Sequence, residues 1–225
     1  MKKTLCVFTA LTLLGCAEST TYAPVVDGNI ERVPSLGNDR MHAHETLYSI
    51  AWRYGLDPRK LARNNHLPYP YHRQDGIALT LTTTSRASSS SSKADTDIPA
   101  PTPTIIHWTM PARGQVIATF SEVNKGIDIA GKLGDPIFTA APGRVVYAGD
   151  GLKNYGNLII IDHDGNFLTA YAHNDTLLVH EDDIVLPNQQ IATLGQSGNS
   201  HLAVHFEIRL NGKPVNPLAY LPAQL

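Results

Sequence analysis

The pattern of apolar and polar residues first predicts a small helical unit. Apolar residues recur at i, i+3, i+4 and i+7 over residues 47–54, which is the spacing of one buried helix face. Gly55 is a typical helix end, and Asp57-Pro58 is a typical start for a second helix. Two flanking strands are also predicted. The apolar pattern is weak at residues 39–42, whereas apolar and polar residues alternate clearly at residues 77–81. The pattern therefore indicates an α+β unit in the order βααβ.

The pattern changes to strands from Trp108 onward. Short alternating or β-branched segments follow one another, separated by turn signals such as Pro142-Gly143 and Asn211-Gly212. A turn near Tyr220 is the one helical feature expected here. About 115 residues of this kind predict a mainly β sandwich or open barrel. The predicted strands are residues 116–120, 127–129, 136–139, 143–148, 158–162, 167–173, 190–194 and 204–210.

Two further segments do not have the pattern of a folded core. Residues 83–104 are dominated by Ser, Thr, Pro and Ala, which indicates a flexible linker. Residues 16–38 are polar and lack a period, as expected of a tether. The folded units are thus predicted at 39–82 and 105–225, and we expect them to move independently.

The N-terminus has the pattern of an export signal. Two lysines precede an apolar run over residues 4–14, which is too short to span a bilayer. The run ends in Leu13-Leu14-Gly15-Cys16, which resembles the lipobox of bacterial lipoproteins; a plain secretory signal is the alternative. The resemblance implies that residues 1–15 are removed and that Cys16 is lipidated. Each buried CH₂ of such a lipid contributes about 0.8 kcal/mol to membrane anchoring.

Composition and charge exclude some classes of partner. Hydrophobic residues make up 42% of the 225-residue chain, which is enough for a packed core. The net charge is −2, so nothing indicates the basic patch that nucleic acid binding needs. Both cysteines lie in the first sixteen residues, so the folded units are expected to have no disulfide.

The small unit resembles the LysM family on three stretches, ETLYSIA at 45–51, LARNN at 61–65 and Asp75-Gly76. The resemblance implies binding of peptidoglycan chains that contain N-acetylglucosamine, with Thr46, Tyr69 and Tyr71 as candidate glycan-binding residues. His44-Glu45 departs from the usual Gly-Asp of the family. A module that binds no glycan, with the tyrosines packed on their own unit, is the alternative.

The β region resembles the LytM or lysostaphin type of zinc endopeptidase on GIDIA at 126–130, TAYAH at 169–173 and HFEIR at 205–209. That resemblance implies a zinc site made of a His, an Asp four residues later, and the second His of a late His-x-His. Two further histidines would act on the water and the transition state. Here Asp128, His173 and His205 are retained, whereas Asn124 and Ala203 stand at the two other positions.

These replacements predict a degenerate cleft with no catalytic residue and no metal ligand. His201 cannot replace the missing histidine, because it precedes His205 by four residues, which in a strand is about 13 Å. We expect a hydrogen-bonded pair of Asp128 and His205, a structural His173, and Tyr155 in the cleft floor. A weak metal site is the alternative interpretation.

The order of lipobox, tether, LysM, linker and LytM resembles the NlpD-like lipoproteins. Matching stretches lie at 124–128, 156–161, 169–176 and 215–222. The resemblance implies a non-catalytic, cofactor-free activator of a periplasmic N-acetylmuramoyl-L-alanine amidase in daughter-cell separation. It would bind peptidoglycan and face the periplasm from the outer membrane of a Gram-negative bacterium. An active zinc endopeptidase and a purely structural wall-binding lipoprotein are the alternatives.

Overall fold

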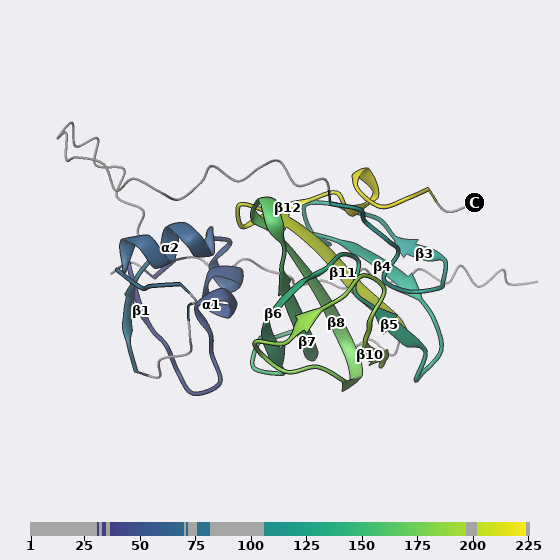
Figure 1. Ribbon diagram of the computed structural model, residues 1–225, viewed down its shortest axis with the longest axis horizontal. Helices are drawn as coiled ribbons and strands as arrows, with labels where there is room; N and C mark the ends of the chain where they lie inside the picture. Colours follow the sequence, from purple (N-terminus) through teal and green to yellow (C-terminus); the bar gives the residue numbers. More distant parts are fainter. Residues whose placement is uncertain are drawn as a thin grey trace, which may run out of the picture.

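The structure, a computed structural model, describes residues 31, 33–34, 37–69, 71, 76–81, 106–196 and 202–223. The predicted signal segment, Cys16, the linker 83–104 and His201 lie outside these residues. No helix in the described part is long and apolar enough to cross a membrane. A small N-terminal module with two helices lies beside a larger β domain (Figure 1).

The N-terminal module, residues 37–81, has the predicted βααβ order. Strand β1 (Asn38–Arg40) pairs antiparallel with β2 (Ala78–Thr80), and helices α1 (Leu47–Tyr54) and α2 (Pro58–Asn64) lie between them in the chain. Thr46 caps α1 by accepting from the Ser49 amide, and Gly55 ends it with a φ of 61°. The module has its own core, made of Met41, Leu47, Ile50, Ala51, Tyr54, Leu61, Ala62, Leu79 and Leu81.

The β domain is an antiparallel sheet, as the alternating pattern predicts. Its strands follow the order β3-β4-β11-β8-β7-β6-β9, with β12 beside β11 and with β10 joining β5 to β8. The bounds are β3 (Val116–Ala118), β4 (Ile127–Ala130), β5 (Pro136–Phe138), β6 (Gly143–Gly149), β7 (Asn157–Asp162), β8 (Phe167–Leu177), β9 (Ile184–Val185), β10 (Gln190–Leu194), β11 (Ala203–Leu210) and β12 (Lys213–Val215).

The strand prediction is confirmed for every predicted segment, with small shifts at the ends. Strand β8 continues four residues beyond the predicted end at His173. The sequence analysis missed β9 and β12 because each has only two or three residues. Two single 3₁₀ turns, η1 (Asp164–Asn166) and η2 (Pro217–Ala219), complete the domain, and the second matches the turn expected near Tyr220.

The side chains of strand β11 point alternately to the two faces of the sheet. Val204, Phe206 and Ile208 point into the main core of the β domain. Because side chains alternate along a strand, His205 and Glu207 lie on the opposite face. This second face, which we call the site face, also carries apolar side chains of β6, β7 and β8, namely Val146, Leu158, Ile160, Leu168, Ala170 and Ala172.

The N-terminal module packs on the site face, so the expectation of two independently moving units is wrong for this structure. Tyr48 and Trp52 of α1 join the apolar cluster of the site face rather than the core of their own module. Figure 1 shows α1 turned toward the β domain near β6. The physical reason is that α1 has two apolar sides, since Tyr48 and Trp52, four residues apart, lie on a different side of the helix from its core-facing side chains.

Candidate functional site

The site begins with a close pair on adjacent strands. His205 of β11 stands directly opposite Asp128 of β4 in the strand register. Nδ1 of His205 is 2.6 Å from Oδ1 of Asp128, and both residues are buried. The structure thus forms the hydrogen bond that the sequence analysis expected between these two side chains.

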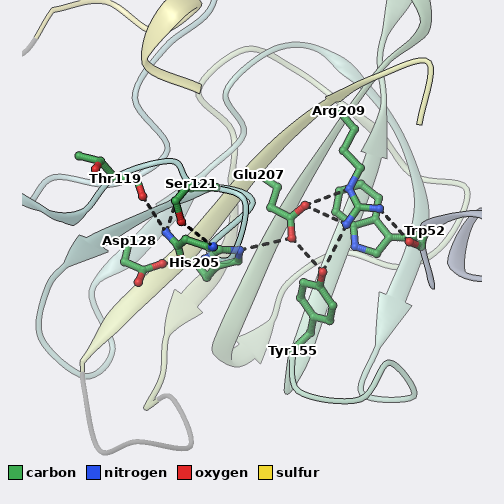
Figure 2. A network of polar contacts seen from close by, with 10 residues as sticks. Trp52, Thr119, Ser121, Asp128, Tyr155, His205, Glu207 and Arg209 are labelled. Atoms are coloured by element: carbon green, nitrogen blue, oxygen red, sulfur yellow. Dashed lines mark hydrogen bonds and ion pairs between the residues drawn. The ribbon is translucent and has the colours of Figure 1, made fainter. Parts of the chain in front are cut away.

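A buried ion network continues from His205 along β11. Nε2 of His205 lies 3.3 Å from Oε1 of Glu207. The other carboxylate oxygen of Glu207 accepts from Arg209 Nε at 2.9 Å, and Tyr155 donates to Oε1 at 2.8 Å. Figure 2 shows these side chains in one continuous row. Sequence reasoning missed Glu207 and Arg209, although their positions two and four residues after His205 place them on its face of the strand.

Charge in the network is balanced between acids and bases. Burial alone would lower the pKa of His205, but hydrogen bonds to Asp128 and Glu207 raise it to about 9. Burial would raise the pKa of Glu207, but the Arg209 guanidinium and His205 hold it below its usual value. His205 is therefore an imidazolium at neutral pH, and each of its ring nitrogens donates to a carboxylate.

His173 is a second, differently charged histidine beside the network. Its ring centre is 6.4 Å from that of His205, and its backbone amide donates to the Tyr155 carbonyl at 2.9 Å. Burial, followed by the positive charge of His205, lowers the pKa of His173 to about 4. Nε2 of His173 is buried with no hydrogen-bond partner among the described residues. The site thus holds one neutral and one charged imidazole.

Asn124 and Ala203 occupy the two replaced positions without rebuilding a polar site. The Asn124 side chain is buried and donates from Nδ2 to the carbonyl oxygens of Gly126 at 3.0 Å and Thr119 at 3.4 Å. Ala203 stands opposite Ala130 in the register and offers only a methyl group. Asn124 is therefore used to hold the loop before β4.

The described residues do not fit a catalytic zinc centre. Such a centre takes three protein ligands and keeps one position open for water. Among the described residues, no three His, Cys, Asp or Glu side chains lie where they could hold one metal ion. Asp128 and His205 are hydrogen-bonded to each other, and both ring nitrogens of His205 lie within hydrogen-bond distance of a carboxylate oxygen. No reaction step is therefore assigned to a metal.

The candidate glycan-binding residues lie at or near the contact with the β domain. Thr46 is buried, and its hydroxyl donates to the Val146 carbonyl of β6 at 3.1 Å. Tyr71 is half-buried, with its ring centre 5.9 Å from that of Tyr48. Only Tyr69 is well exposed, at 65%. Glycan binding at these residues stays a prediction, and docking of the module restricts access to Thr46.

Comparison with known proteins identifies relatives of this chain. Residues 122–217 match the model of peptidase family M23. Murein hydrolase activator NlpD of Escherichia coli is 57% identical over 118 residues, which cover 51% of this chain and 31% of that protein. Lipoprotein NlpD/LppB homolog of Pseudomonas aeruginosa is 38% identical over 221 residues, covering 79% of this chain and 74% of that protein. The chain thus matches about a third of the former and most of the latter.

Proposed function

We propose, because the chain belongs to the family of NlpD/LppB lipoproteins, that it activates a peptidoglycan hydrolase without being a catalyst itself. The partner we propose is a periplasmic N-acetylmuramoyl-L-alanine amidase, and the process is wall remodelling during daughter-cell separation. The name murein hydrolase activator, borne by the Escherichia coli relative, supports this proposal.

One observation carries the non-catalytic part of the proposal. In the row from Asp128 to Arg209, each charged group is bonded to a neighbour of opposite charge. A histidine that binds zinc must offer a free, unprotonated ring nitrogen, whereas both ring nitrogens of His205 are engaged by the carboxylates of Asp128 and Glu207. His173 remains neutral, but Ala203 and Asn124 supply no acid, base or metal ligand beside it. The site therefore retains Asp128, His173 and His205 but lacks the two other side chains that the chemistry of the peptidase family uses.

The proposed place of action follows from the N-terminal sequence. Residues 1–15 would serve as the export signal, and the lipid on Cys16 would anchor the chain to the outer membrane. The site face would then look into the periplasm, where peptidoglycan and the amidase are found. Binding of peptidoglycan by the N-terminal module would hold the activator near its partner's substrate.

The test is amidase activity on isolated, dye-labelled sacculi with and without the full chain. The proposal expects faster dye release with the chain present and none from the chain alone. Stimulation requires that the chain bind the active conformation of the amidase better than the inactive one. Because the amidase has a finite number of binding sites, stimulation should saturate with activator concentration. Absence of stimulation across that range would refute the activator function.

The same samples discriminate the two alternatives. An active zinc endopeptidase requires stoichiometric zinc in the purified chain and cleavage of crosslinked peptides in sacculi without amidase. A purely structural wall protein requires sedimentation with sacculi and no change in amidase rate. The proposed activator gives sedimentation, stimulation and no crosslink cleavage.

A further inference from the structure

The site face is shared between the candidate site and the docked module. His205, Glu207 and Arg209 lie on it in a row, and the cross-strand neighbours of the first two are Ala172 and Ala170 of β8. Alanine side chains rise little above a sheet, so the face is low beside the row. A segment that binds along the whole row would lie beside these alanines and contact Arg209.

Helix α1 already occupies the Arg209 end of this row. The Trp52 ring lies over the Arg209 guanidinium, whose central carbon is 3.5 Å from the ring centre. Nη1 of Arg209 donates to the Trp52 carbonyl at 2.7 Å, and Nζ of Lys213 donates to the Gly55 carbonyl at 3.0 Å. Cations at the end of a helix satisfy carbonyl groups that have no partner inside it. The face thus binds α1 by an aromatic ring and by helix-end carbonyls.

Tyr155 contacts both the candidate site and the docked helix α1. Its hydroxyl donates to Glu207, its ring centre is 6.4 Å from that of His205, and it packs edge-on against Trp52 at 6.5 Å. A binder that contacts both His205 and Arg209 therefore meets α1. Site and docking surface are neighbouring parts of one surface.

The module can leave without losing its own core. Tyr48 and Trp52 belong to the cluster on the site face, whereas the core of the module is formed by other side chains. The 24 residues from 82 to 105, which contain the predicted linker, separate the described residues of the two units. A chain of that length can span up to about 80 Å when extended, so it does not force the units together.

We propose that the N-terminal module and the partner hydrolase compete for the site face, so that the activator is closed while α1 covers Arg209. The identity of the partner rests on the function proposed above; the competition rests on the contacts of α1. The competing segment of the hydrolase presents an aromatic ring and a carbonyl or carboxylate oxygen, the groups that α1 gives to Arg209.

A substitution at Gly212 opens the contact without touching the site. Gly212 has a φ of 79° in the turn after β11, and a Cβ there would overlap the backbone of Leu56 in the module. The test variant is Gly212→Asn, because Asn tolerates positive φ better than other residues. The matched control is Gly134→Asn, where φ is 84° and no atom lies within 4 Å of the added Cβ.

Two measurements on the full chain, with Cys16→Ser to prevent lipidation, test the proposal. Small-angle X-ray scattering should show a larger radius of gyration for Gly212→Asn than for the wild type or Gly134→Asn. In the sacculus assay, the activator concentration for half-maximal stimulation should fall about tenfold or more for Gly212→Asn, if the open form is a minor state of the wild type. Trp52→Ser, made on the module side of the contact, should give the same two results.

Three results would overturn the proposal, and they differ in what else they refute. Opened variants that stimulate at the wild-type concentration would refute the competition and leave the activator function standing. Both variants staying compact would show that α1 is not held by these contacts. No stimulation by the wild type or by any variant would refute the activator function and, with it, the partner named here.

Discussion

The Arg209 guanidinium lies between the Trp52 ring of the N-terminal module and the Glu207 carboxylate of its own strand, and only 1% of Arg209 is exposed. Its Nη2 also reaches the Tyr155 hydroxyl at 3.3 Å. Burying a guanidinium so completely is tolerated because its donors find acceptors on both sides. This one side chain therefore connects the docked module with the candidate site.

Removing that guanidinium should be strongly destabilising. In Arg209→Leu the fully buried Glu207 loses its main counter-charge, and breaking a buried ion pair in this way costs about 3–5 kcal/mol. The matched control is Arg144→Leu, whose ion pair with Asp182 is solvent-exposed and contributes at most about 1 kcal/mol. Urea unfolding of both variants measures the difference. Similar losses in both would contradict the buried network.

The two histidines of the site predict opposite pH dependences of stability. The pKa of His205 is raised from 6.5 to about 9, so its contribution is complete below pH 6.5 and is lost as the pH rises through 9. The pKa of His173 is lowered from 6.5 to about 4, so its contribution is present above pH 6.5 and is lost as the pH falls through 4.

Substitution separates the two contributions. In His205→Gln, the free energy of unfolding should no longer show the decrease between pH 6.5 and 9 that is due to His205. The decrease on acidification should remain. His173→Gln should do the reverse, apart from the similar contribution of buried His163, whose pKa burial also lowers to about 4. Denaturant unfolding at a series of pH values gives both slopes. If the free energy of unfolding of His205→Gln fell between pH 6.5 and 9 as steeply as that of the wild type, the charged imidazole would be contradicted.

Restoring the two replaced histidines should create a metal site. In Asn124→His with Ala203→His, the first substitution adds a third ligand to Asp128 and His205, which is the number that a catalytic zinc requires. We expect about one zinc per chain after dialysis in this double variant and much less in the wild type, measured by elemental analysis. Ala203→His alone is the control, because it lacks the histidine at position 124. Equal zinc in all three proteins would contradict this interpretation.

Sacculus binding should depend on docking as well as on the glycan-binding residues. Thr46 is covered in the docked form and Tyr71 lies beside Tyr48, so opening with Gly212→Asn should strengthen sedimentation with sacculi. Gly134→Asn should sediment like the wild type. Tyr71→Ala in the opened chain should weaken binding, because stacking of an aromatic ring on the sugar is lost. No effect of Tyr71→Ala would indicate a module that binds no glycan.

The strands and the central pair could be predicted from sequence because both depend on local spacing. The alternation of apolar and polar residues predicts the strand that carries His205. In the structure, the register of that strand sets His205 opposite Asp128. The same alternation contains Glu207 and Arg209, which lie inside the matched HFEIR stretch but were missed because the family resemblance implies no site role for these two positions. Their charge on a face otherwise made of apolar residues was the available signal.

Docking of the module could not be predicted from the core-facing pattern of α1. Leu47, Ile50 and Tyr54 explain one side of the helix, and a single apolar stripe is compatible with a free module. Tyr48 and Trp52 form a second stripe, which a helix exposed on that side would not need. Which surface the second stripe meets depends on contacts far apart in the sequence, such as Tyr48 with Asp162, whose side chains are hydrogen-bonded at 2.9 Å.

The position of Trp52 gives the chain an intrinsic optical probe. The chain contains two tryptophans, and the other, Trp108, packs against Phe167 and Tyr220 inside the β domain. Opening of the module would transfer Trp52 alone from a buried cationic surface to water. Indole fluorescence and its quenching by acrylamide would then follow the opening in real time, without a label.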